Sequence, residues 1–236
     1  MTAGTDPQPI TVVPASAEHL PQTARVLADA FLTEGFITHL FDLSTEIRRE
    51  RWRGILAQFA ASWHNKGQPI LVALHDNEPL GVAIVKQPGN QAESFWVEVS
   101  ALLPHPPLLL SLVSKVRWRR LSAVFRAMQP PETLGKDCFT LEALAVAPSH
   151  QGRGIGRLLL NAVHEMAERA ADANAIYLYT ADEHNRAIYE RSGYRTLASV
   201  KGGAEFTVHH MVRPLHVEDA PDRMHGADQS SERVDS

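Results

Sequence analysis

Cysteine is nearly absent from the sequence, since Cys138 is the single one among 236 residues. No disulfide can therefore form within the chain, which favours a cytoplasmic protein whose thiol stays reduced. Long apolar runs are also lacking, because no stretch approaches the roughly 18 apolar residues of a membrane span. Residues 1–9 hold neither a basic residue nor an apolar run, so we expect no secretory signal there.

An excess of positive charge is missing as well. Lysine and arginine number 23 against 27 aspartates and glutamates, which gives a net charge of −4. No overall basic field would therefore draw the protein to nucleic acid. Hydrophobic residues make up 44% of the chain and charged residues 21%, as in a globular domain that buries its own core. The composition predicts a protein that binds neither nucleic acid nor membrane.

Both ends of the chain are poor in apolar residues. Residues 1–9 are small and polar, and residues 215–236 are rich in Asp, Glu, Ser and Gly. Such segments bury too little apolar surface to offset the entropy of ordering. We expect two disordered tails around a single domain over residues 10–214.

Within this domain, strand-like and helix-like apolar patterns alternate. Strands are expected over 10–13, 70–74, 80–86, 138–146, 175–180, 194–200 and 205–212, and helices over 17–31, 45–64, 155–171 and 184–191. In the second helix, Ile47, Ile55, Phe59 and Trp63 are expected to face inward. The turn His75–Pro79, rich in Asp and Asn, predicts a hairpin. The strand–helix–strand order after residue 138 predicts an α/β fold whose sheet of about seven strands is mixed.

The stretch 94–136 is less regular than its surroundings. Pro104, Pro106 and Pro107 precede an apolar and basic segment over residues 108–128. We expect one or two helices inserted before the fourth strand. Their basic side chains either form a solvated face, as charge runs usually do, or help to build a substrate pocket.

The loop Gln151-Gly-Arg-Gly-Ile-Gly156 joins a strand to a helix. Its glycines let backbone N–H groups approach an anion, and the helix adds unpaired N–H groups and partial positive charge. The pattern suits a pyrophosphate, or it is a plain glycine-rich turn. A P-loop is disfavoured because Arg157 stands where Lys-Ser/Thr is needed. A dinucleotide fingerprint is disfavoured because the third glycine comes two residues after the second instead of three.

Two segments together resemble the GNAT superfamily of N-acetyltransferases. Gln151, Gly154 and Gly156 match its Gln/Arg-x-x-Gly-x-Gly/Ala motif, and Asn185–Tyr194 matches Asn-x-x-Ala/Ile-Tyr-Glu-x-x-Gly-Phe/Tyr. The resemblance implies a GNAT fold with a splayed central sheet, and an enzyme that uses acetyl-CoA and no metal. The pattern is most similar to small-molecule acetyltransferases, such as those that confer puromycin resistance.

The resemblance also implies which residues hold CoA. The pantetheine arm would pair with the fourth strand, the pyrophosphate would lie on the glycine loop, and a basic side chain of the insert is one candidate for the adenosine 3′-phosphate. An N–H group, that of Val146 above all, would polarise the thioester carbonyl. The implied residues are Leu144, Ala145, Val146, Gln151, Gly152, Arg153, Gly154, Ile155, Gly156, Arg157, Asn185 and Tyr189.

Tyr189 and Glu142 are the candidate catalytic residues. The resemblance places Tyr189 at the sulfur, where a phenol of pKa roughly 10 can protonate a thiolate of pKa roughly 8.5. The alternative is a core aromatic. Glu142 stands in an otherwise apolar strand, where a carboxylate is costly unless it is paired or functional. It is either a general base or a structural carboxylate. Strict alternation would put it on one face with Leu144 and Val146, unless a bulge intervenes.

Other candidates rank below these two. His209 and His210 alternate faces of a strand, so they cannot bind one metal together, and no cluster has zinc spacing. Cys138 is expected to be a buried, inert thiol. Four aromatic side chains either line the acceptor site or pack in the core: Trp96, Trp118, Tyr177 and Tyr179.

The expected activity is transfer of an acetyl group to a primary amine of a small molecule, by direct attack on the thioester. Two alternatives stay open: an enzyme that acetylates lysine or the N-terminus of proteins, and a CoA-binding sensor without catalysis. Retention of both Glu142 and Tyr189 argues against the sensor. The sequence leaves homodimer formation open.

Overall fold

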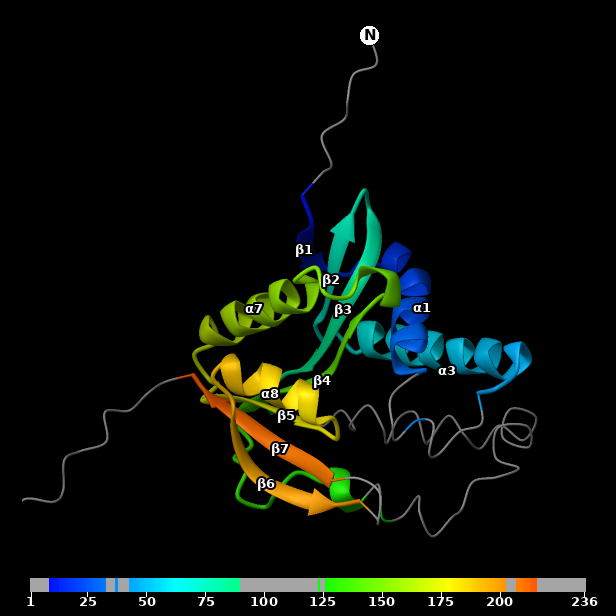
Figure 1. Cartoon of the computed structure of the whole chain (residues 1–236). Coiled ribbons are helices and arrows are strands. Elements are labelled where there is room, and N and C mark those ends of the chain that lie inside the picture. Colours follow the sequence, from blue (N-terminus) through cyan, green and yellow to red (C-terminus); the bar gives the residue numbers. More distant parts are fainter. Residues whose placement is uncertain are drawn as a thin grey trace, which may run out of the picture.

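The computed structural model describes residues 9–32, 37, 43–89, 123, 126–202 and 207–215. These residues form one seven-stranded mixed sheet flanked by helices, as predicted, in the strand order β1-β2-β3-β4-β5-β7-β6 (Figure 1). Nearly all of both predicted tails, and the predicted insert as far as residue 122, lie outside the described residues. No helix among the described residues is long and apolar enough to cross a membrane.

The strands lie close to the expected positions. They are β1 (Thr11–Pro14), β2 (Ile70–His75), β3 (Glu78–Lys86), β4 (Cys138–Val146), β5 (Ala175–Thr180), β6 (Arg195–Lys201) and β7 (Thr207–Pro214). Of the six strand pairs described, β4–β5 is parallel and the others are antiparallel. The β2–β3 hairpin turns at Asp76 and Asn77, whose φ angles are 50° and 64°. Asp and Asn tolerate this left-handed conformation better than other residues do, which explains the turn signal.

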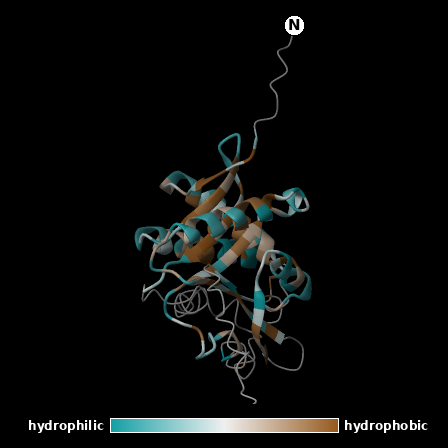
Figure 2. Cartoon of the chain, turned by 90° about the vertical axis from the view of Figure 1, so that its left-hand side faces the viewer, coloured by the Kyte–Doolittle hydropathy of each residue, from teal (hydrophilic) through white to brown (hydrophobic). Residues whose placement is uncertain are grey.

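The helices cover both faces of the sheet. They are η1 (Ala17–His19), α1 (Leu20–Phe31), α3 (Glu46–Asn65), η2 (Pro148–His150), α7 (Ile155–Glu168) and α8 (Glu183–Arg191). In Figure 1, α1 and α3 lie on one side of the sheet, and α7 and α8 lie on the other. Figure 2 shows apolar residues gathered on the central strands and hydrophilic residues on the outer turns of the helices.

Each face therefore has its own apolar core. Trp52, Phe59 and Trp63 of α3 are fully buried against the strands on one face. Ile155 and Leu159 of α7 are buried on the other face. The two cores hold the central strands from both sides and fix where the ends of β4 and β5 lie.

The prediction that Ile47 faces inward is wrong, because its side chain is 68% exposed. At about 100° per residue, Ile55, Phe59 and Trp63 share one arc of α3, whereas Ile47 lies roughly 80° outside that arc. The buried side of α3 also includes Trp52, Leu56 and Ala60.

Helix α7 approaches the sheet closely at Gly81 of β3. A Cβ atom at this position would lie 2.9 Å from Leu159 Cδ1, 3.0 Å from Ile155 Cγ2 and 3.2 Å from the carbonyl oxygen of Ala145. The absence of a side chain thus lets the first turns of α7 pack directly on β3 and β4. The loop that precedes α7 is thereby held next to the end of β4.

We predict that Gly81→Ala lowers the free energy of unfolding by about 1–3 kcal/mol, because the new methyl group overpacks this contact. Gly54→Ala is the matched control. Gly54 lies on an exposed side of α3 with nothing within 4 Å of its Cβ position, so alanine should stabilise the helix by about 0.5–1 kcal/mol. Denaturant unfolding measures both. Equal effects of the two substitutions would contradict the close approach of α7.

Candidate functional site

Strands β4 and β5 are paired only at their beginnings. Cys138–Thr140 pairs with Ala175–Tyr177, whereas the described register gives Leu141–Val146 no partner on β5. Beyond that point β4 continues along β3, and β5 continues along β7. The two strands therefore part and leave an opening between Leu141–Val146 and Leu178–Thr180, which we call the strand gap. The splayed sheet that was predicted is confirmed.

Backbone groups of β4 face the strand gap. The N–H of Ala147 donates to the carbonyl of Leu80 on β3 at 2.8 Å. Because successive strand residues direct their N–H and C=O groups to opposite sides, Leu144 and Val146 direct theirs away from β3, toward the gap. The side-chain amide of Gln151 reaches the same edge, where Nε2 donates to the Val146 carbonyl at 3.2 Å. A strand-like ligand would find an edge ready for pairing here.

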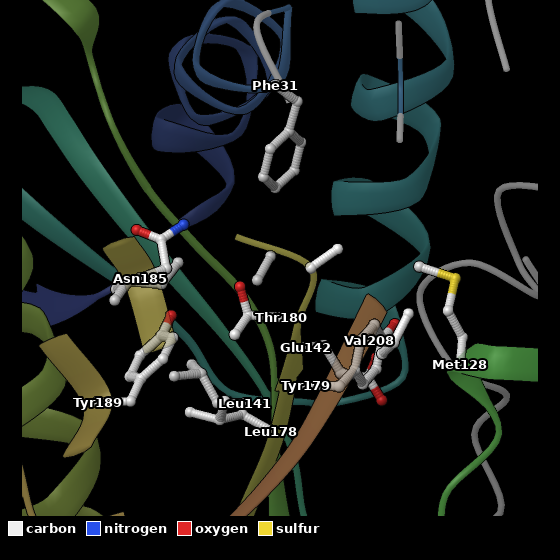
Figure 3. A pocket seen from close by; sticks show the side chains of 13 residues that line it. Phe31, Met128, Leu141, Glu142, Leu178, Tyr179, Thr180, Asn185, Tyr189 and Val208 are labelled. Atoms are coloured by element: carbon white, nitrogen blue, oxygen red, sulfur yellow. The ribbon is translucent and has the colours of Figure 1, made fainter. Parts of the chain in front are cut away.

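A pocket with a cavity volume of about 80 Å³, open to solvent on one side, occupies the strand gap. Glu142 of β4, Thr180 of β5 and Tyr189 of α8 contribute polar groups to it (Figure 3). Phe31 at the end of α1 and Met128 lie across the pocket from Tyr189 in the same view. The two predicted catalytic residues thus line one pocket.

A β-bulge lies at Glu142. Ile84 pairs with Ala143, but the next residue of β3, Val85, pairs with Leu141, so Glu142 has no residue opposite it. Strict alternation therefore fails at this position, because a bulge shifts the facing of the residues that follow. Ala143 belongs to the core beneath α3, whereas Leu144 packs toward the core beneath α7. Glu142 accordingly does not share a face with Leu144 and Val146.

The carboxylate of Glu142 is buried, with 8% of the residue exposed. It lies near the phenol of Tyr177, whose pKa is raised first by burial and then by the negative charge of Glu142. A buried carboxylate next to an opening is a strong local attractor for a cation. Such a group can also accept a proton from an amine that enters the pocket.

Helix α8 directs Asn185 and Tyr189 toward the strand gap. The helix begins at a true cap, since the carboxylate of Asp182 accepts the N–H of Asn185 at 2.8 Å. It ends at Gly193, whose φ of +87° suits the left-handed position of a Schellman motif, and the N–H of Tyr194 donates to the Tyr189 carbonyl at 3.1 Å. Asn185 and Tyr189 lie one turn apart, half-buried, and both line the pocket (Figure 3).

The ring of Tyr189 is braced from behind by Tyr194. The two rings meet edge to face, with centroids 5.6 Å apart. The Tyr194 hydroxyl is hydrogen-bonded to Nε2 of His164 at 3.2 Å. Burial lowers the pKa of His164 to about 4, with a smaller contribution from the positive charge of Arg213. His164 is therefore neutral at physiological pH, and its hydrogen bond with Tyr194 links α7 to the ring that supports Tyr189.

The glycine loop adjoins the end of β4. Gly152 and Gly154 have φ angles of +76° and +81°, which most residues with a side chain adopt only with strain, and Gly154 is the N-cap of α7. Arg153 and Arg157 are exposed beside them. The side chain of Ile155 is buried in the core, so this residue can offer a ligand only its backbone. The loop therefore combines left-handed glycines, the N-terminus of α7 and the exposed cations of Arg153 and Arg157, an arrangement that suits an anion.

Some predicted residues lie elsewhere. Tyr177 is fully buried and donates a hydrogen bond to Nδ1 of His210 at 2.6 Å, so it packs behind the pocket, whereas Tyr179 lines it. Trp96 and Trp118 lie outside the described residues. Phe31, Met128, Thr180 and Val208 line the pocket but were not predicted. Of these, Thr180 could have been found, since ligand sites gather at the carboxyl ends of parallel strands.

The remaining candidates have structural roles. His209 interacts with Ser199 and Glu183, while His210 donates from Nε2 to the Ala127 carbonyl, so the two rings face different sides. The Cys138 thiol is buried, donates to the carbonyl of Gly135 and has a pKa raised by burial. Across the described residues, no three His, Cys, Asp or Glu side chains are grouped as metal ligands.

Residues 35–194 match the model of the acetyltransferase (GNAT) family. The chain shows no significant match to curated protein sequences. Among solved structures, histone acetyltransferase HPA2 and related acetyltransferase from Corynebacterium glutamicum shares 20% identity at a TM-score of 0.63, over 90% of this chain and 99% of that chain.

Two further structures have the same fold. The protein yncA from Salmonella typhimurium, solved with its cofactor acetyl-CoA, shares 15% identity at a TM-score of 0.54, over 92% of this chain and 99% of that one. The ribosomal-protein-S18-alanine N-acetyltransferase from Escherichia coli shares 15% identity at a TM-score of 0.52, over 92% and 100%. These similarities confirm the predicted GNAT fold.

The buried His164 predicts a pH dependence of stability. Its pKa of about 4 in the folded protein lies below the roughly 6.5 of an exposed histidine. Between these values the unfolded chain binds a proton that the folded chain does not, so stability is complete above pH ~6.5 and falls as the pH drops toward 4. Between pH 7 and pH 4.5, the melting temperature of His164→Gln should fall by less than that of the wild type. Parallel losses in the two proteins would show that His164 does not titrate in this way.

Proposed function

The chain belongs to the acetyltransferase (GNAT) family, and we propose that this N-acetyltransferase transfers the acetyl group of acetyl-CoA to a primary amine of a small molecule. The observation that carries the proposal is the strand gap, with a strand edge for the donor and both Glu142 and Tyr189 on its walls. Acetyl-CoA supplies an activated thioester when bound.

The residues present fit this donor. The backbone groups of Leu144 and Val146 that face the strand gap can pair with the amides of a pantetheine arm, and Asn185 adds a side-chain amide nearby. The loop with Gly152 and Gly154, followed by the first turn of α7, suits a pyrophosphate. The N–H of Val146 is the proposed donor to the thioester oxygen, a contact worth about 2.7–4 kcal/mol in comparable sites.

Glu142 and Tyr189 handle the protons in the proposed reaction. The amine nitrogen forms a bond to the acetyl carbon while the carbon–sulfur bond breaks. A bound ammonium group first loses one proton to solvent by way of Glu142. As the neutral amine attacks, Glu142 takes a second proton from the nitrogen, directly or through a water, and Tyr189 gives its proton to the sulfur. The products are an amide and the free thiol of CoA. Both side chains then return to their starting states by proton exchange with solvent.

A small-molecule acceptor is favoured over a protein because apolar side chains border the pocket opposite α8. Phe31, Met128 and Val208 come from three different segments and surround Glu142 on that side. A protein substrate would have to bring a lysine or an N-terminus, with its polar backbone, past these groups. Release of free thiol with a panel of amines and peptides tests the activity. Tight CoA binding with no thiol release on any amine would rule it out.

We predict that Tyr189→Phe lowers kcat by about 10²–10⁴-fold, because the proton donor to sulfur is lost while the ring is kept. Affinity for acetyl-CoA should change little. Tyr194→Phe is the control, since its hydroxyl is bonded to His164 outside the pocket. Its kcat should stay within about twofold of the wild type. Equal kcat values for Tyr189→Phe and the wild type would remove Tyr189 as the acid and leave the activity standing.

We also predict that Gly154→Asp weakens CoA binding at least about tenfold, because a carboxylate would lie beside the pyrophosphate and repel it. A tenfold change in affinity corresponds to about 1.4 kcal/mol of binding free energy. Gly154→Asn is the matched control, since Asn has the same shape without the charge and likewise tolerates the φ of +81°. Isothermal titration with CoA measures both variants. Equal affinities for Asp and Asn would show that the loop does not hold the pyrophosphate.

A further inference from the structure

The pocket has two chemically different ends. At one end, Asn185 and Tyr189 of α8 adjoin the edge of β4 that suits the donor (Figure 3). At the other end, Phe31, Met128 and Val208 form what we call the acceptor wall. The three side chains of the acceptor wall are apolar, so they bind the body of a ligand through burial, while the hydroxyl groups of Tyr179 and Thr180 also line the described part of the pocket.

Charge within the pocket is concentrated at one point. Among the described residues that line it, Glu142 is the only one with a formal charge, and it lies between the two ends. A primary amine carries a positive charge at neutral pH, and the carboxylate attracts it toward the position where the donor carbonyl would lie. A second cation further along the ligand would find no second carboxylate among the described residues that line the pocket.

A buried chain of hydrogen bonds anchors the segment of the acceptor wall that carries Met128. Nε2 of His210 donates to the carbonyl of Ala127 at 2.9 Å, and Nδ1 accepts from the Tyr177 hydroxyl at 2.6 Å. All three residues are essentially inaccessible to solvent. The chain ties the backbone at Ala127, next to Met128, to β5 and β7, so this segment has a fixed place beside the pocket.

These observations together specify the acceptor. We propose that the preferred acceptor is a monoamine with an apolar alkyl or aryl body, whose ammonium group is drawn to Glu142 while its body packs on Phe31, Met128 and Val208. This inference rests on the proposed acetyl transfer. An amine with a neighbouring carboxylate would bring a second negative charge to Glu142, and a diamine would bury an unpaired cation at the acceptor wall. Both are therefore poor substrates.

Two matched pairs of amines test the inference in a thiol-release assay. Hexylamine and 1,6-diaminohexane differ only in the far end, and 2-phenylethylamine and phenylalanine differ only in the carboxylate. We expect kcat/KM to be at least about tenfold higher for the first member of each pair, the discrimination that one mismatched group in an apolar pocket provides. Peptides with a free alanine N-terminus or a lysine should react more slowly than hexylamine.

Variants of the acceptor wall test which residues discriminate. Met128→Gln should reduce the hexylamine preference over diaminohexane by about tenfold without changing KM for acetyl-CoA, since a polar group of similar length would then face the far end of the ligand. Val208→Thr, which keeps the side-chain shape, tests the same surface if Met128→Gln folds poorly. Ile47→Gln, at an exposed position of α3 outside this pocket, should leave the preference unchanged.

The outcomes distinguish the preference for an apolar monoamine from the proposed acetyl transfer. A higher kcat/KM for diaminohexane, phenylalanine or a peptide would overturn the apolar-monoamine inference and leave acetyl transfer intact. An unchanged preference in both Met128→Gln and Val208→Thr would do the same. Thiol release on no amine at all, with CoA bound, would overturn the proposed function and this inference with it.

Discussion

The parting of β4 and β5 is the constraint on which the site depends. The two strands share three residue pairs and then follow different neighbours, β4 along β3 and β5 along β7. Separated strands direct the N–H and C=O groups of Leu144 and Val146 at an opening, where the Val146 carbonyl accepts from the side chain of Gln151 and an unmade hydrogen bond would cost about 1–3 kcal/mol if water were excluded. The proposed pantetheine arm would satisfy these groups, which makes the sheet defect itself a binding surface.

Two further features bring the proposed reactive groups and the glycine loop to this opening. The bulge at Glu142 sets one carboxylate out of register with β3 and next to the strand gap, although β4 is otherwise apolar except for Thr140. The missing side chain at Gly81 lets α7 pack on β3, so the loop that begins this helix adjoins the end of β4. On the opposite wall, Asp182 and Gly193 fix the two ends of α8, and Tyr194 supports the ring of Tyr189. The proposed acid and base thus belong to separately anchored elements.

Much of the donor side could be predicted from the sequence, because it is encoded locally. It consists of continuous segments: the strands β4 and β5, the glycine loop, and the helix with Asn185 and Tyr189. The apolar periodicity of each segment, and the glycines and caps at its ends, can be seen in the sequence. The bulge at Glu142 could not be predicted, since β4 carries apolar residues on both faces and their alternation gives little signal for which way each one points. The acceptor wall could not be predicted either, because Phe31, Met128 and Val208 meet only through tertiary packing.

This difference explains why the family is easier to infer than the acceptor. A donor shared by many enzymes needs backbone edges and glycines, which leave regular marks in the sequence. An acceptor is selected by burial and charge at one place, and on the proposed reaction the charge changes during turnover. The amine arrives as a cation attracted to Glu142 and leaves as a neutral amide that the carboxylate no longer attracts. In the proposed reaction, Glu142 would therefore hold the amine more tightly than the amide, which favours release of the product after each turnover.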